Sequence, residues 1–90
     1  MSRRVRVFGR VQGVWFRGWA LDEARSLGLD GWVRNRRDGS VEMLLSGPDE
    51  AMARMIERCR EGPSAARVER IDVEETEEAA PAGFAQRATA

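Results

Sequence analysis

Residues 9–18, with the sequence GRVQGVWFRG, combine residue types that can bind an anion. The segment holds three glycines, a glutamine, two aromatic residues and, near its end, Arg17, between a strand-like and a helix-like stretch. Glycine-rich turns before a helix present backbone N–H groups to anions, and a guanidinium adds a planar pair of donors. The spacing and the lysine of the common nucleotide-binding phosphate loop are absent. The segment alone predicts either an anion cradle or a turn whose glycines only relieve backbone strain.

The composition excludes several kinds of chemistry. The 90 residues contain no His, Tyr or Lys, and Cys59 is the only thiol. Disulfide scaffolds, Cys/His zinc sites, histidine bases and Schiff-base lysines are therefore excluded. Cys59 falls in phase with Met52, Met55 and Ile56 at helical spacing, which favours core packing over a nucleophilic role.

The charge is balanced overall but unevenly placed along the chain. Residues 1–40 carry nine arginines against four acidic residues, and residues 41–90 carry six against eleven. A cationic first half favours an anionic ligand, and arginine is well shaped for bidentate contact with phosphate or carboxylate. A genome-wide codon bias toward Arg explains the surface arginines equally well.

Hydrophobic periodicity predicts alternating strands and helices. Strands are expected at residues 3–9, on both arms of a hairpin within residues 30–47, and at residues 66–75; helices are expected at residues 18–29 and 48–61. Asp38-Gly39 is a strong turn signal for the hairpin. Pro48 suits the first position of the second helix. Val68 is out of phase with Ile71 and Val73, which indicates an irregular start to the strand.

This element order predicts an α+β fold, the ferredoxin-like α/β sandwich with βαββαβ order. An antiparallel sheet of four to five strands would carry two helices on one face. We expect one domain over residues 1–90, in which residues 75–90 are weakly ordered or form a short final strand at Phe84. The chain starts MSRRVRV without an apolar signal segment, and no apolar run approaches the roughly 18 residues of a membrane span, so a cytoplasmic location without a membrane partner is expected.

Two segments together, residues 7–17 and 31–47, resemble the two signature segments of the acylphosphatase family. The resemblance extends through residues 23–29, Gly62-Pro63 and Val68, and it covers most of residues 4–74. The matching residues are Gly9, Val11, Gln12, Gly13, Phe16 and Arg17 in the first segment, and Gly31, Trp32, Val33, Asn35, Gly39, Val41 and Gly47 in the second. Past residue 75 the match is thin.

The resemblance implies an enzyme, an acylphosphate phosphohydrolase that splits the carboxyl–phosphate bond of acyl phosphates without metal or cofactor. It implies that Arg17 binds the substrate phosphate and that Asn35 positions the attacking water. The phosphate-binding loop would comprise Val11, Gln12, Gly13, Val14, Trp15, Phe16 and Arg17. A small-molecule acyl phosphate would be the only partner, bound by a monomer, and the physiological acyl group is left open.

The residues alone leave alternatives for these assignments. From its position, Asn35 is better explained as the residue that begins the hairpin. Gln12 is expected to shape the loop rather than contact substrate, and Trp15 and Phe16 to form wall and core. Arg10, Arg34, Arg36 and Arg37 are solvated surface residues or attract anionic substrate.

Two other classes of protein share the element order. In an RNA-binding module, Phe8 and Trp32 would lie on the open sheet face beside Arg4, Arg6 and Arg34. The aromatic-rich strand pattern of such modules is absent, and zero net charge argues against strong polyanion binding, so no nucleic-acid partner is expected. A regulatory domain, or an accessory domain of a larger carbamoyl-transfer enzyme, is the third interpretation.

The absence of a ligand cluster near the two segments generates a prediction about metals. Neither segment holds His, Cys or closely spaced carboxylates, so hydrolysis of an acyl phosphate should need no bound ion. Activity should survive dialysis against a chelator, measured as kcat before and after treatment. A loss that Mg²⁺ or Zn²⁺ restores would contradict this expectation.

Overall fold

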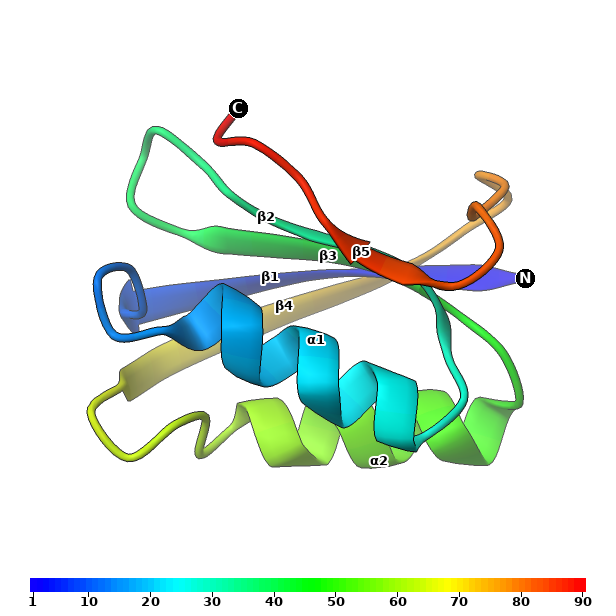
Figure 1. The fold of residues 1–90 in the computed structure, drawn as a ribbon, viewed down its shortest axis with the longest axis horizontal. Coiled ribbons are helices and arrows are strands. Elements are labelled where there is room, and N and C mark those ends of the chain that lie inside the picture. The colour runs from blue at the N-terminus through cyan, green and yellow to red at the C-terminus, as the bar shows by residue number, and fades with distance from the viewer.

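The computed structural model describes residues 1–90 as one five-stranded sheet with two helices on one face (Figure 1). The elements in chain order are β1 (Ser2–Arg10), α1 (Phe16–Ser26), β2 (Asp30–Asn35), β3 (Val41–Ser46), α2 (Asp49–Cys59), β4 (Arg67–Thr76) and β5 (Phe84–Gln86). The strands lie in the order β4-β1-β3-β2-β5. The predicted ferredoxin-like α+β arrangement is therefore confirmed.

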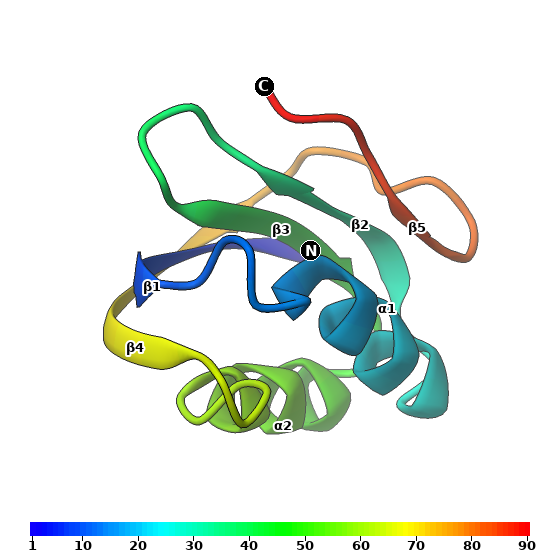
Figure 2. The ribbon, with the colours of Figure 1, turned by 60° about the vertical axis from the view of Figure 1, so that its left-hand side comes forward.

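The sheet is mixed rather than purely antiparallel. β1 pairs antiparallel with β3 and β4, and β2 pairs antiparallel with β3. The short β5 pairs parallel with β2 at the sheet edge, which differs from the expected antiparallel sheet. The chain enters β5 after a connection that passes from β4 across the end of the sheet, so β5 runs in the direction of β2 (Figure 2).

The core lies between the sheet and the helices. Alternation along β1 turns Val5 and Val7 toward the helices, and Cys59 packs among the same buried side chains, as predicted. The fully buried large side chains of this core are Phe16, Met43, Leu45, Met52, Met55, Val5, Val7, Val11, Val33, Val41 and Cys59, whereas Leu44 is buried on the other face of the sheet. The core therefore reaches the beginning of α1 and fixes where the preceding loop ends.

The end of β1 contains the irregularity that the phase of Val68 predicts. The register shifts so that Phe8 pairs with Arg70 and Gly9 with Val68, which leaves Glu69 as the extra residue of a bulge. Gly9 has φ 125°, and a Cβ there would overlap the carbonyl oxygen of Arg67. Only glycine fits this close approach, after which β1 leads directly into the loop.

The helix starts differ from their predicted positions. α1 begins at Phe16, two residues before the predicted start, because the buried Phe16 ring anchors its first turn. Pro48 is the N-cap of α2 rather than its first helical residue, with an extended ψ of 142°. Asp49 and Glu50 lie in the first turn, where they complement the helix dipole. Neither helix is long and apolar enough to cross a membrane.

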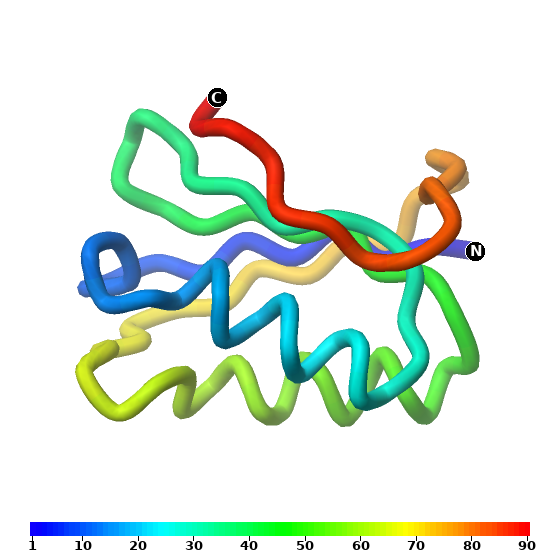
Figure 3. The backbone as a smooth tube through the Cα atoms, in the orientation of Figure 1, coloured from blue at the N-terminus to red at the C-terminus, as the bar shows by residue number.

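The segment after β5 continues beside β2 toward the hairpin (Figure 3). The N–H of Arg87 donates to the carbonyl of Val33 at 2.8 Å, and the N–H of Ala90 donates to that of Asn35 at 2.9 Å. Residues 84–90 are therefore attached to the sheet. The connection at residues 77–83 forms no regular element, but Glu78 and Gly83 are hydrogen-bonded to Ser2 and Gly31 of the sheet.

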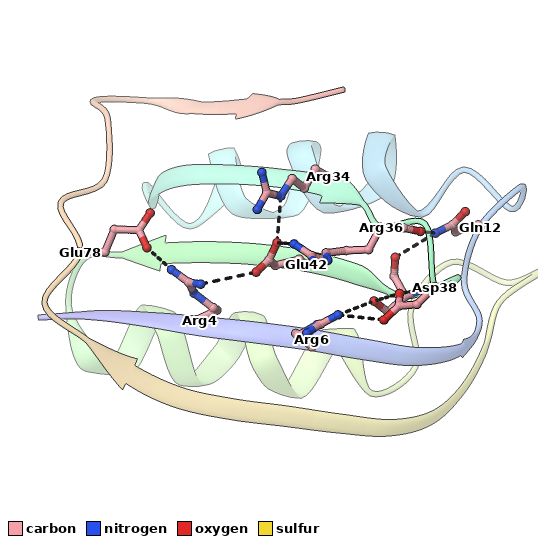
Figure 4. A network of polar contacts seen from close by, with 9 residues as sticks. Arg4, Arg6, Gln12, Arg34, Arg36, Asp38, Glu42 and Glu78 are labelled. Atoms are coloured by element: carbon pink, nitrogen blue, oxygen red, sulfur yellow. Dashed lines mark hydrogen bonds and ion pairs between the residues drawn. The ribbon is translucent and has the colours of Figure 1, made fainter. Parts of the chain in front are cut away.

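The open face of the sheet is organised around the buried carboxylate of Glu42 (Figure 4). Glu42 is 2% exposed and accepts hydrogen bonds from Arg34 Nε at 2.8 Å and Arg36 Nη1 at 3.2 Å. Arg4 Nη1 lies 3.7 Å from its other oxygen. Burial alone would raise the pKa of Glu42, but the hydrogen bonds and charges of Arg34 and Arg36 outweigh it, so this pKa lies below its usual value. The carboxylate therefore stays ionised and fixes the two arginines that flank Asn35.

Replacement of Glu42 by Gln should destabilise the fold in a pH-dependent way. At pH 7 the variant should lose about 1–3 kcal/mol of unfolding free energy, because three guanidiniums lose their shared anion. Folding lowers the pKa of Glu42, so its contribution is present above the unfolded value, about 4.3, and is lost as the pH falls through the folded value. Urea titrations at neutral pH and near pH 3 should show the difference between wild type and variant shrinking in acid, and an equal difference at both would refute the assignment.

Candidate active site

A hollow of about 170 Å³ lies where the loop after β1 meets the end of β2. Three segments that are far apart in the sequence contribute to it, and they include Arg17 and Asn35. Its lining residues are Val11, Gln12, Gly13, Trp15, Phe16, Arg17, Gly18, Asn35 and Gln86. Of the residues predicted for the phosphate loop, Val14 alone does not line the hollow, because its side chain packs against the core instead.

The loop leaves its backbone donors unpaired. None of the backbone hydrogen bonds outside the helices and strands has its donor in residues 11–18. The N–H groups of the first helical turn, residues 16–18, have no acceptor four residues earlier inside the helix. The positive end of the α1 dipole also lies here. Consecutive free N–H groups beside a guanidinium form a site for an anion with several acceptor oxygens.

Two residues with positive φ turn the loop into the helix. Gly13 has φ 73°, and no heavy atom lies within 4 Å of the position of an added Cβ, so its backbone conformation and not its size demands glycine. Trp15, the N-cap of α1, has φ 65° and ψ 27° and is the only other positive-φ residue of the loop. A bulky side chain in this left-handed region costs on the order of 1–3 kcal/mol, and such strain is typical of functional sites.

Gln12 connects the loop to the β2–β3 hairpin. Its Nε2 atom donates to the carbonyl of Arg36 at 2.6 Å and to that of Ser40 at 2.9 Å, across the base of the hairpin turn (Figure 4). The predicted role of Gln12 in shaping the loop is consistent with these contacts. Both amide hydrogens of one side chain are used, so the loop is held at a fixed position relative to Asn35.

The hairpin turn is itself fixed by Asp38. Its carboxylate accepts from the Ser40 hydroxyl at 2.6 Å and from the Ser40 N–H at 2.9 Å. These two hydrogen bonds from Ser40 lower the pKa of Asp38 below its ordinary value. Arg6 Nη2 donates to the second carboxylate oxygen at 2.9 Å. The turn that accepts from Gln12 is therefore tied to β1 as well.

The C-terminal segment holds both catalytic candidates. Nη1 of Arg17 donates to the carbonyl of Arg87 at 3.2 Å, which leaves its other guanidinium nitrogens free of protein partners. Ala90 donates to the backbone carbonyl of Asn35 and accepts from the N–H of Arg37 at 2.9 Å. The contacts of Ala90 fix the backbone beside Asn35 without using its side-chain amide. The contact with Arg87 orients the guanidinium of Arg17 through Nη1 and leaves Nε and Nη2 free to meet an anion.

Gln86 and the backbone of residues 87–90 are parts of the site that the sequence did not indicate. Gln86 lines the hollow from β5, and Arg87 contributes only its carbonyl to Arg17. Main-chain contacts leave no pattern of residue types. The resemblance to a known family was also thinnest here, so no signal in the sequence identified this segment.

The other polar and aromatic side chains of the open face contact one another. Trp32 is 2% exposed and lies beneath the guanidiniums of Arg34 and Arg87, 4.7 and 4.9 Å from its ring centroid. Its ring face is therefore unavailable for base stacking. Arg34 and Arg36, which were expected to be solvated or to attract anionic substrate, are partly exposed and form ion pairs with Glu42, because β2 and β3 place them directly beside this buried carboxylate.

The lone thiol and the largest hollow lie away from this site. Burial, and to a lesser extent the nearby Glu23 charge, raises the pKa of Cys59 to about 12, so the thiol remains protonated in the core. A hollow of about 450 Å³ lies between the end of α1 and β5, and none of the predicted site residues lines it. No group of three or more Cys, Asp or Glu side chains is arranged to hold a metal ion.

The fold and the loop define a ferredoxin-like domain with a candidate anion site at the start of α1, and comparisons with known proteins specify it further. The acylphosphatase family profile matches residues 3–86. An acylphosphatase of Rhizorhabdus wittichii is 54% identical over 89 residues, covering 99% of this chain and 90% of that protein. The crystal structure of acylphosphatase from Bacillus subtilis superposes with a TM-score of 0.91 at 38% identity, over 96% of this chain and 97% of that one.

The same domain also matches part of a longer protein. Full-length HypF, in a phosphate- and nucleotide-bound crystal structure, contains a region with a TM-score of 0.90 and 28% identity, covering 98% of this chain and 12% of that chain. The family profile and the relatives of similar length agree with one another. This chain belongs to the acylphosphatase family, and its predicted identity as an acylphosphatase enzyme is confirmed.

The contacts of Gln12 generate a prediction. Gln12→Ala should lower kcat/KM for an acyl phosphate about tenfold, the equivalent of about 1.4 kcal/mol, because two hydrogen bonds between the loop and the hairpin are lost. Arg10→Ala, a change at an exposed neighbouring position, should leave kcat/KM within about twofold. Steady-state kinetics on both folded variants is the measurement, and wild-type kcat/KM in Gln12→Ala would show that the loop keeps its position without this side chain.

Proposed function

We propose that this acylphosphatase hydrolyses its substrate in the hollow between Arg17 and Asn35. Arg17 and the free N–H groups of residues 11–17 hold the phosphoryl group, and the Asn35 side chain positions the attacking water. The observation that carries the proposal is the convergence of the unpaired loop donors, Arg17 and Asn35 on one hollow of about 170 Å³.

The reaction requires charge stabilisation and positioning more than covalent work. Water oxygen attacks phosphorus, the bond between phosphorus and the acyl oxygen breaks, and the carboxylate leaves with the bonding electrons. One proton of the water passes to a phosphoryl oxygen, so the products are a carboxylate and dihydrogen phosphate. The charge on the equatorial phosphoryl oxygens is met by N–H donors and a guanidinium that are already oriented, which is the arrangement that stabilises a phosphoryl transition state. A carboxylate leaves without protonation, so no general acid is needed.

Asn35 is suited to orient the water rather than to take its proton. A side-chain amide accepts a hydrogen bond through Oδ1 and donates through Nδ2, but it does not act as a base near neutral pH. Alternation along β2 places Asn35 on the same face as the buried Val33, toward the loop. Its backbone is held by Ala90, so the side chain starts from a fixed point.

In this proposal the enzyme is a cytoplasmic monomer that acts on a small-molecule acyl phosphate. It needs no nucleic-acid or membrane partner and no metal or cofactor.

Substitutions of Arg17 and Asn35 should separate phosphate binding from water positioning. Arg17→Gln should nearly abolish turnover and weaken inhibition by inorganic phosphate, and Arg17→Lys should restore little, because an ammonium lacks the planar fork. Asn35→Ala should lower kcat by about 10² or more while the phosphate inhibition constant stays within a few-fold. Arg10→Gln is the matched control for loss of one positive charge and should retain turnover.

The measurement is the phosphate inhibition constant against kcat for each variant that retains the wild-type circular dichroism spectrum. Equal loss of phosphate binding in Asn35→Ala and Arg17→Gln would show that the division of roles is wrong. Near-normal kcat in folded Asn35→Ala would mean that Asn35 only begins the hairpin turn.

A further inference from the structure

Trp15 is a large apolar side chain left in solvent beside the hollow. It is 66% exposed, and the other exposed large hydrophobic residues are Met1 and Val73, neither of which lines the hollow. Trp15 does line it. An exposed aromatic ring is unremarkable by itself, so its position and its fixation carry the argument.

The indole is held in place rather than free to move. The left-handed backbone of Trp15 directs its side chain over the first turn of α1. A Cβ at Gly18 would overlap the pyrrole edge of the indole, so the ring lies directly against the backbone of Gly18. Glycine at this helical position permits a contact that any other residue would exclude. The ring is therefore a fixed wall at the mouth of the hollow.

The hollow accommodates a small acyl phosphate but not an aromatic one. Because water in the liquid occupies about 30 Å³ per molecule, a volume of about 170 Å³ holds about five waters, which is the space of a phosphoryl group with an acetyl group. The loop donors and Arg17 would bind the phosphoryl group. A larger acyl group, such as a benzoyl group, must then extend outward, past Trp15.

We propose that Trp15 forms the subsite for large acyl groups, so that its ring raises kcat/KM for aromatic acyl phosphates relative to acetyl phosphate. This inference rests on the proposed phosphate site between Arg17 and Asn35. An aromatic acyl group packed against the indole gains apolar contact and ring–ring interaction, whereas an acetyl group is too small to cover the ring. The left-handed strain at Trp15 then serves to place the ring at the mouth.

The test compares kcat/KM for benzoyl phosphate with kcat/KM for acetyl phosphate. Both substrates share the phosphoryl group, so their ratio cancels any effect of a substitution on phosphate binding. Trp15→Asn removes the ring with a residue that tolerates the left-handed region, and it should lower the ratio about threefold to tenfold, the scale of one aromatic contact. Trp15→Phe keeps an aromatic face and should keep the ratio within about twofold of wild type.

Val73→Asn is the matched control, because it replaces an apolar side chain that is 44% exposed on β4, away from the hollow, and it should leave the ratio unchanged. A wild-type ratio in folded Trp15→Asn would overturn the subsite while the activity stands. Should Trp15→Asn fail to fold, inhibition of the wild type by phenylphosphonate and methylphosphonate decides: the phenyl compound should bind several-fold more tightly, and equal binding overturns the subsite. A wild type that hydrolyses neither substrate would instead refute the proposed function itself.

Discussion

The double hydrogen bond from Gln12 to the carbonyls of Arg36 and Ser40 is the contact on which the site depends. A loop that binds an anion through its own N–H groups cannot use those groups to hold itself in place. The loop must therefore be fixed by other means, and side-chain contacts to a neighbouring element are the means that remain. Gln12 provides this fixation from within the loop, and the buried Phe16 and Val11 anchor its two ends.

The open face of the sheet supports the hairpin that receives Gln12. Glu42 binds the arginines on both sides of Asn35, and Asp38 fixes the turn and binds Arg6 of the neighbouring strand. The carboxylates of Glu42 and Asp38, which lie away from the helices, thus help to fix the position of Asn35 on the other face of the sheet. An arginine-rich surface that looks suited to polyanions is in this protein largely bound to its own carboxylates, which agrees with its zero net charge.

The sequence predicted the element order, the core alternation and the position of the bulge, because hydrophobic periodicity and glycine placement are local properties. It placed Arg17 and Asn35 together only through a family resemblance, since their proximity results from the pairing of β2 with β3 and from the Gln12 contact. The parallel pairing of β5 was not predicted, because a three-residue strand has too few side chains to show a period. The hydrogen bonds of residues 87–90 involve backbone atoms, which any residue supplies.

The contact between Arg17 and Arg87 joins residues that are 70 positions apart. Contacts of such separation carry a higher loop-closure cost than contacts between near neighbours and tend to form after the nearer pairings of β1, β3 and β2. Arg87 directly follows β5, the edge strand of three residues. Because β5 is short, it can detach from the sheet at a lower free energy than unfolding of the core requires. The chain can thus be folded while Arg17 lacks its carbonyl partner, and a pool of protein that appears native by its core would include molecules whose proposed phosphate site is incompletely assembled.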